Sequence, residues 1–362
     1  MKKTVRVAAV FVFLFSLFAI PTYASGKEEE FWKSFTELTN GGVPKDYSEV
    51  LGSVGIESLL SEVLSAVGEG VGGAASFLVM LLGICVLLSV AESGSPIEST
   101  VLSRHGAAGI SMISAVLIFA RIGPLAFSVR DSLSVLTSFF SGLIPIMTGI
   151  LSAGGNVSSA ATQAVNMNIT LGIISYVSSS LMLPLVFALF ALSLAQSTDS
   201  TTASAVAKSL RGLFMWALGI GTAVIIGAVS MQSIIAGAQD SAYLRAAKYA
   251  ANGMIPVVGS TVSGALATLA GGLSYVKSAV GVSSVMIMIA YTLSPLVTLL
   301  LYRFAFSVAM SFLEILGVNS GARTLGAFRS ALDSLISVYA LSAVVYICEV
   351  VVFMKSGVNA FG

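Results

Sequence analysis

Few side chains of this sequence could carry chemistry, and their spacing matches no catalytic pattern. The single histidine, His105, lies at the edge of an apolar run. No H-E-x-x-H, G-x-S-x-G, Walker lysine or C-x-x-C motif occurs, so neither metal-assisted hydrolysis nor a nucleophile with a base partner is indicated. We therefore expect no enzymatic activity, no cofactor and no metal site. The aspartates after the N-terminal region are expected in loops or at span ends: Asp131, Asp199, Asp240 and Asp333.

Two further patterns are expected to be structural. Residues 68–73 carry the letters of the dinucleotide fingerprint G-x-G-x-x-G, but that motif works only at a turn between a strand and a helix. These glycines lead instead into an apolar run, so we predict a flexible or closely packed start of a membrane helix. Cys85 and Cys348 each lie inside an apolar run without a ligand partner nearby, which predicts buried, inert thiols.

Three ionisable residues near the C-terminus lie in or beside apolar runs. Arg303 and Glu314 are 11 residues apart, which places them on one face of a helix. Glu349 lies within the last apolar run. Because burying a charge in hydrocarbon is costly, such residues indicate a polar path or a buried inter-helix pair. We favour the other interpretation, in which Arg303 extends to the membrane interface and Glu314 marks a helix end, because such charges are common near the membrane surface.

Two prolines, Pro184 and Pro295, interrupt apolar runs. A proline removes one backbone hydrogen bond and kinks a helix, which packing between membrane helices tolerates. Broken helices at matching positions also point to a transport site. No coordinating acid or amide lies beside either proline, so we favour packing and keep the transport site as the alternative.

The elements that position these residues are membrane helices. The sequence is 56% hydrophobic and 10% charged, whereas a soluble domain is about 25% charged. The net charge of +1 provides no basic face, so nucleic acid is not an expected partner. We predict an all-α, polytopic membrane helix bundle in contact with lipid. Its spans, each near the ~20 residues that a bilayer core requires, are 72–91, 106–127, 168–195, 212–236, 279–301 and 334–354.

The N-terminus has the form of a secretory signal peptide. A basic start and a short apolar run are followed by small residues that suit cleavage after Ala24. We therefore predict a signal peptide over 1–24, a short exported acidic segment over 25–70 and a membrane domain over 71–362. Cleavage would leave the new N-terminus outside the cytoplasm. An uncleaved signal anchor is the alternative.

An internal repeat is predicted in the membrane domain. Two short matches recur with the same separation of 111 residues, and such symmetry is typical of membrane conduits and carriers. The predicted units cover about 106–211 and 212–322, ahead of the final span 334–354. The matches are Gly142-Leu143-Ile144-Pro145-Ile146 with Gly253-Met254-Ile255-Pro256-Val257, and Pro184-Leu185-Val186 with Pro295-Leu296-Val297.

Each unit is expected to contain a turn and a broken segment. An Asp-Ser turn is predicted at Asp131 and again at Asp240, the second followed by a short surface helix to Tyr249. The Ile-Pro segments, residues 133–151 and 254–272, either cross the membrane or form re-entrant hairpins, and their composition favours the hairpins. The candidate conduit or packing positions are Gly142, Pro145, Pro184, Gly253, Pro256, Gly259, Pro295, Arg303 and Glu314, and the candidate partner-facing residues are Arg245 and Lys248.

Part of the second unit resembles a known family. The segments Ala246-Ala247-Lys248-Tyr249-Ala250, Ile255-Pro256-Val257-Val258-Gly259 and Lys277-Ser278-Ala279-Val280-Gly281 resemble stage III sporulation protein AE of endospore-forming bacteria. The layout of signal sequence, exported region, polytopic domain and terminal span is also similar, so the resemblance covers nearly the whole chain.

The resemblance implies a function that the residues alone do not indicate. The family belongs to a set designated AA to AH, made in the mother cell and placed in the membrane around the engulfed forespore. With a forespore-side partner, the set would form a channel or secretion-like apparatus that includes a cytoplasmic ATPase and ring-forming proteins. This chain would be its permease-like membrane core, and no catalytic or ligand-binding residue is carried over. An autonomous solute carrier and a purely structural membrane scaffold are the alternatives.

Overall fold

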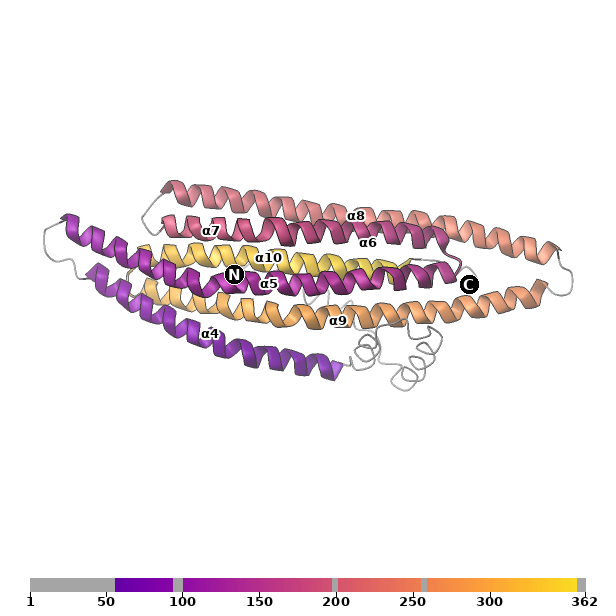
Figure 1. Cartoon of the computed structure of the whole chain (residues 1–362), viewed down its shortest axis with the longest axis horizontal. Coiled ribbons are helices and arrows are strands. Elements are labelled where there is room, and N and C mark those ends of the chain that lie inside the picture. Colours follow the sequence, from indigo (N-terminus) through magenta and orange to yellow (C-terminus); the bar gives the residue numbers. More distant parts are fainter. Residues whose placement is uncertain (1–55, 94–99, 197–200, 255–258, 357–362) are drawn as a thin grey trace. The chain divides into compact units, whose positions relative to one another are not determined.

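The computed structural model describes residues 56–93, 100–196, 201–254 and 259–356, and these ranges are helical apart from short turns. All of them belong to one compact unit, Gly55–Gly362. The predicted signal peptide and most of the exported segment lie outside the described residues. The helices (Figure 1) are α4 (Ile56–Ser93), α5 (Thr100–Ala153), α6 (Val157–Tyr176), the π-helix η1 (Val177–Met182), α7 (Leu183–Gln196), α8 (Thr201–Met254), α9 (Gly259–Ile315) and α10 (Asn319–Lys355).

The six predicted spans are confirmed. Among the described residues, 6 helical segments are long and apolar enough to cross a membrane, and each overlaps one predicted span. The fold is therefore the helical bundle of a multi-pass membrane protein. The segments are Gly70–Val90, Met112–Ala153, Val157–Ser193, Thr202–Tyr243, Gly272–Ile315 and Asn319–Lys355.

The first Ile-Pro segment is neither broken nor a hairpin, contrary to expectation. Residues 133–151 are the second half of α5, a continuous helix of 54 residues. Pro145 lies inside it and lacks the N–H that would bond to the carbonyl four residues earlier. The Thr148 hydroxyl, 2.8 Å from the Ile144 carbonyl, adds a hydrogen bond in the same turn. At 1.5 Å per residue, α5 is about 80 Å long, well beyond a hydrocarbon core of ~30 Å.

The second Ile-Pro segment is described only in part. Residues 255–258, which include Pro256, lie outside the described residues, while residue 254 ends α8 and residues 259–272 begin α9. The internal repeat therefore stays a prediction at this match.

The predicted Asp-Ser turns are wrong. Asp131 and Asp240 lie inside α5 and α8, and the expected surface helix is a continuation of α8. The serines that follow, Ser132 and Ser241, each donate a hydrogen bond to the carbonyl four residues earlier, at 2.9 Å and 2.8 Å. A serine whose hydroxyl bonds back to its own helix no longer favours a turn.

Pro184 is accommodated by a change of helix type. It is the second residue of α7, directly after η1. The proline ring collides with the carbonyl four residues earlier in a regular α-helix, and the wider turn of a π-helix relieves that collision. Pro295 lies inside α9 with no such change among the described residues. The two prolines are thus accommodated differently.

Two short turns, in contrast, share one geometry. Gly155 after α5 and Gly317 after α9 have φ values of 77° and 78°. In both turns the next N–H bonds back five residues, from Asn156 to Leu151 and from Val318 to Leu313, each at 3.0 Å. This is a Schellman motif, which satisfies the last carbonyls of a helix and needs a left-handed residue. Each turn connects its helix directly to the next, α5 to α6 and α9 to α10.

Replacing Gly317 by alanine is expected to lower the free energy of unfolding by about 1 kcal/mol, since a Cβ disfavours the left-handed conformation. No atom lies within 4 Å of that Cβ, so the cost is conformational and not steric. The matched control is Gly227→Ala, where the added Cβ also meets open space but the residue lies within α8. Thermal unfolding in a mild detergent should show the control unchanged or stabilised. Equal melting temperatures for the two variants would contradict the assignment.

The core centres on α10, which contacts α5, α6, α7, α8 and α9. In Figure 1 it runs through the bundle beside α5, α7 and α9. Tyr339 and Tyr346 are fully buried on it, and their hydroxyls reach the Tyr291 carbonyl (3.3 Å) and Thr137 (3.0 Å). Since lipid is itself apolar, such packing and hydrogen bonds hold membrane helices together better than apolar burial does.

The glycines that spell the dinucleotide motif lie in α4 where it packs against α9. A Cβ on Gly70 would come within 3.2 Å of the Thr298 hydroxyl, and one on Gly73 within 3.2 Å of the Tyr302 hydroxyl. Tyr302 also stacks on Phe77 of α4, with ring centroids 4.9 Å apart. Gly70 and Gly73 therefore permit a close helix contact, the closely packed alternative of the prediction, whereas a Cβ on Gly68 would meet no atom within 4 Å.

Candidate functional site

α8 is the least buried of the membrane-length helices. Only 6% of its apolar stretch is buried, compared with 33% to 50% in the other five described spans. Large apolar side chains on it are exposed, among them Leu213, Trp216 and Ile234. Because apolar contact gives little advantage over lipid, polar contacts are expected to fix the position of this helix.

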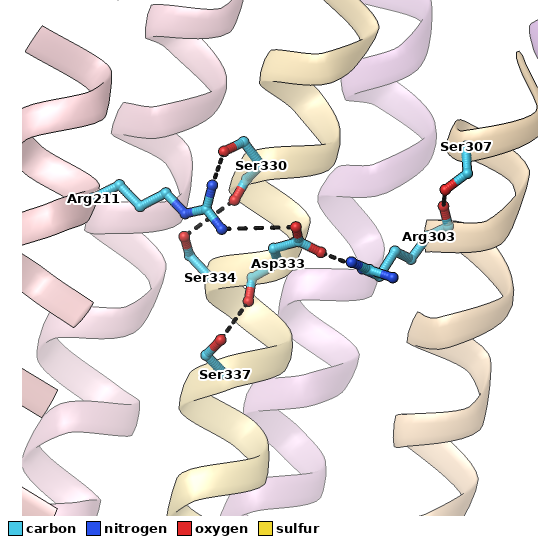
Figure 2. Close-up of polar contacts among 7 residues, drawn as sticks. All are labelled: Arg211, Arg303, Ser307, Ser330, Asp333, Ser334 and Ser337. Atoms are coloured by element: carbon cyan, nitrogen blue, oxygen red, sulfur yellow. Dashed lines mark hydrogen bonds and ion pairs between the residues drawn. The ribbon is translucent and has the colours of Figure 1, made fainter. Parts of the chain in front are cut away.

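Two arginines and one aspartate form the first polar contact of α8, here called the three-helix ion cluster (Figure 2). Asp333 of α10 accepts a hydrogen bond from Arg303 Nε of α9 at 2.6 Å. Its other oxygen lies 3.7 Å from Arg211 Nη2 of α8. Arg211 also donates to the Ser330 hydroxyl on α10. One carboxylate thus connects three helices.

The spacing of polar residues on α10 explains why the Asp333 carboxylate bonds to neighbouring helices and not to its own helix. Ser330, Asp333, Ser334 and Ser337 have the spacing of neighbours on one helix face. Ser334 and Ser337 donate to the carbonyls of Ser330 and Asp333, at 3.2 Å and 2.7 Å, within their own helix. Their hydroxyls are satisfied there, which leaves the Asp333 carboxylate to pair with groups from α8 and α9.

The cluster can clamp helices and attract an anion, but it carries no catalytic arrangement. Two positive charges face one negative charge, so a single positive charge is left over. The three side chains are 23% to 34% exposed, which allows water or a headgroup to reach them. Among the described residues, no group of three or more His, Cys, Asp or Glu side chains could hold a metal ion.

Asp240 makes the second polar contact of α8, and it is buried inside a helix where a loop position was expected. Its two carboxylate oxygens accept hydrogen bonds from the backbone N–H groups of Ser158 (2.9 Å) and Ser159 (2.7 Å). These N–H groups belong to the first turn of α6, whose own N-cap, Asn156, makes no side-chain cap bond. A carboxylate at this position satisfies free N–H groups and meets the positive end of the helix dipole. α8 therefore caps α6.

Replacing Asp240 by alanine is expected to lower the free energy of unfolding by about 1–2 kcal/mol, the usual cost of losing a helix cap with its charge. Asp131→Ala is the matched control, because Asp131 stands in the same Asp-Ser dipeptide but is exposed on α5. The control is expected within about 0.5 kcal/mol of the wild type. Thermal unfolding in detergent distinguishes the two, and equal losses would contradict the capping role.

Arg303 does not pair with Glu314, the residue that its sequence spacing suggested as a partner. Glu314 is exposed at the penultimate position of α9, while Arg303 pairs with Asp333 on the next helix. The interpretation of Glu314 as a helix-end residue fits this placement, whereas Arg303 forms an inter-helix pair and does not extend alone to the interface. Asp333, Arg211 and Asp240 were not singled out as site residues, although the spacing of Ser330, Asp333, Ser334 and Ser337 was a readable signal.

The other candidate positions are spread over α5, α7, α8 and α9, and no hydrogen bond or ion pair joins any two of them among the described residues. Gly142 and Pro145 are half-buried and exposed on α5, and Pro184 is exposed on α7. Pro295 is half-buried on α9 and Arg245 is exposed on α8. Gly253 and Lys248 lie in α8, Gly259 is the first residue of α9, and Pro256 lies outside the described residues.

Comparison with known proteins gives one family and one relative of interest. The profile of the family described as stage III sporulation protein AE matches residues 44–357. The stage III sporulation protein AE of Bacillus subtilis (strain 168) is 24% identical over 281 residues, which cover 77% of this chain and 70% of that protein. No solved structure matches the chain.

Proposed function

Because this chain belongs to the stage III sporulation protein AE family, we propose that it is a non-enzymatic membrane component of a channel or secretion-like assembly joining mother cell and forespore. The proposal places it in the mother-cell membrane around the forespore, with its N-terminus exported after signal cleavage. Its partners would be the other stage III sporulation proteins, including an ATPase and ring-forming components, and a forespore-side protein.

The observation that carries the proposal is the family match over nearly all of the membrane domain. The architecture supports it in one respect. A bundle whose spans reach 42 and 44 residues has far more apolar length than the ~20 residues a bilayer core requires. Protein neighbours in an assembly would cover part of that length. In this proposal the half that contains Pro256 lines the conduit or grips a partner, and the internal repeat reflects a duplicated membrane unit.

The proposal is tested by deletion and co-purification. Deleting the gene in an endospore-forming host is expected to stop sporulation after engulfment, and a tagged chain from sporulating cells is expected to bring down the ATPase and ring-forming proteins. Normal spores from the deletion strain would overturn the proposal. Saturable uptake by the reconstituted chain alone would favour a solute carrier.

Charge reversal tests the predicted partner-facing residues. Arg245 is exposed near the C-terminal end of α8, so Arg245→Glu is expected to reduce co-purification without changing the melting temperature. Arg130→Glu is the matched control, because Arg130 is also exposed but lies on α5. Equal effects of the two variants would show that general surface charge, and not this end of α8, governs partner binding.

A further inference from the structure

A polar seam lies between α6 and α10 in the interior of the bundle. Ser159, Gln163, Asn166 and Thr170 follow one another on one face of α6 and are each at most 4% exposed. Their spacing of three or four residues is that of a single helix face. Gln163 and Thr170 both bond to Glu349 of α10, which is 2% exposed. Serine, threonine, asparagine and glutamine commonly form hydrogen bonds between membrane helices, so the feature that requires an explanation is the buried carboxyl of Glu349.

Glu349 is held by hydrogen bonds from neutral groups. The Thr170 hydroxyl donates to Oε1 at 2.5 Å, and Gln163 Nε2 lies 3.3 Å from Oε2. No ion pair to Glu349 exists among the described residues. An isolated carboxylate in a low-dielectric interior is costly, and two neutral donors do not supply its missing charge.

The seam also contains buried polar atoms that lack a hydrogen-bond partner among the described residues. Gln163 Oε1, Asn166 Nδ2 and Ser159 Oγ are buried and have no hydrogen-bond partner among the described atoms. Buried polar groups in native proteins are nearly always satisfied, and an exception indicates a further ligand, such as an ion or a water molecule. Gln163 bonds to Glu349 through its nitrogen, so its unused oxygen belongs to the same side chain that already touches the carboxylate.

The two other buried charged side chains among the described residues, Asp240 and Lys277, are bonded elsewhere, and only Lys277 carries the sign that could neutralise Glu349. Asp240 accepts hydrogen bonds from the first N–H groups of α6, at the positive end of that helix. Lys277 of α9 is buried and donates to the Ser356 carbonyl, at the negative end of α10. Glu349 lies before Lys355, the last residue of α10, where the helix dipole gives a negative charge no stabilisation. One negative charge therefore remains unmatched.

We propose that this seam is a monovalent-cation site in which Glu349 carries a proton or a sodium ion. A proton makes the carboxyl neutral and able to donate a hydrogen bond of its own. A sodium ion would take oxygen ligands from Glu349, Thr170 and the unused Gln163 oxygen, the ligand type that hard cations prefer. Ionisable residues inside membrane bundles commonly serve proton or ion pathways. The inference needs only the membrane bundle and does not depend on the proposed function.

Few other titratable groups face Glu349, so a pH response can be assigned to it. α6 contributes none in the seam, and residues 132–153 of α5 contain no ionisable side chain. α8 contributes Asp240 and α9 contributes Lys277, both bonded as described. On α10 itself the neighbours are Cys348 and Tyr346, and the Tyr346 hydroxyl is bonded to Thr137.

The test uses the full-length protein in detergent and the apolar reagent dicyclohexylcarbodiimide, which modifies protonated carboxyl groups in apolar surroundings. We expect mass spectrometry to find an adduct on Glu349 at acidic pH, with loss of labelling as the pH rises. Adding sodium chloride separates the two cations: protection by sodium but not by choline identifies a sodium site, and no protection identifies a proton site. Glu314, which is exposed, reports modification by a water-soluble carbodiimide and serves as the internal control.

A second measurement applies if the reagent does not enter the bundle. Glu349→Gln preserves the shape of the neutral acid, so its melting temperature is expected within about 2 °C of the wild type at neutral pH, while Glu349→Ala melts several degrees lower. Infrared spectra of the wild type should contain a protonated-carboxyl or sodium-sensitive carboxylate band that Glu349→Gln lacks. The proposal is overturned if Glu349→Gln melts as low as Glu349→Ala and the band of Glu349 responds to neither pH nor sodium.

Discussion

Replacing Asp333 by alanine is expected to lower the free energy of unfolding by about 2–3 kcal/mol, one of the two largest effects of a single substitution considered for this bundle. The variant removes the acceptor that α8 and α9 share and leaves Arg211 and Arg303 facing each other without a counter-charge. The expected loss is smaller than for a fully buried pair, because the side chains are 23% to 34% exposed and water screens part of the interaction. Thermal and chemical unfolding of the purified protein in detergent measures the loss.

A compensating variant separates this charge effect from a general packing defect. Combining Asp333→Ala with Arg303→Met removes one stranded positive charge and is expected to recover a large part of the stability. Glu314→Ala is the control, because this exposed helix-end residue should change the free energy of unfolding by less than about 0.5 kcal/mol. If the double variant is less stable than Asp333→Ala alone, the stranded charges do not cause the defect.

The second large effect is expected at Gly281, where α9 and α10 approach closely. A Cβ at this position would overlap Met354 Cγ and lie 2.7 Å from its sulfur. A leucine must displace the Met354 side chain from its contact with α9, at an expected cost of about 3 kcal/mol. The same face of α9 carries Lys277, whose bond to the Ser356 carbonyl would be strained by any separation of the helices. The measurement is the melting temperature together with the yield of folded protein.

Two further variants test whether the clash with Met354 causes that loss of stability. Gly281→Leu combined with Met354→Ala makes room for the new side chain and should restore much of the stability. Gly83→Leu on α4 adds the same side chain where no atom lies within 4 Å of the new Cβ, and it should be tolerated. A similar loss in Gly83→Leu would mean that leucine in any of these helices is harmful and that the α9–α10 contact is not special.

The membrane spans were predictable from the sequence because hydropathy sums over some 20 residues and each span exceeds the requirement by itself. The spans that contain Cys85 and Glu349 could be predicted without knowing which helices pack beside them. The resemblance read from Lys248, Pro256 and Lys277 was likewise a property of short segments, and the family match confirms it. Features that depend on a single segment, such as the spans and the family resemblance, were therefore predicted correctly.

Features that depend on a neighbouring helix were not predictable. The Asp-Ser dipeptides resemble turns locally, but Asp240 lies inside α8, where its carboxylate caps α6. The two residues whose N–H groups it accepts, Ser159 and Ser158, lie 81 and 82 residues earlier in the sequence. The pairing of Arg303 with Asp333 likewise requires knowing that α9 turns back at Gly317. For Asp240 and Arg303, tertiary contacts overrode local preference. Pro145 was expected to break its segment, yet α5 continues through it.

The cap that Asp240 places on α6 also has a consequence for the order of events during synthesis. The turn at Gly155 allows α5 and α6 to emerge from the ribosome as a hairpin before α8 has been translated. Until Asp240 follows, 82 residues after Ser158, the first N–H groups of α6 lack their carboxylate partner. Until then, water or a lipid headgroup must satisfy those N–H groups, so this end of the nascent hairpin is expected to stay out of the hydrocarbon core.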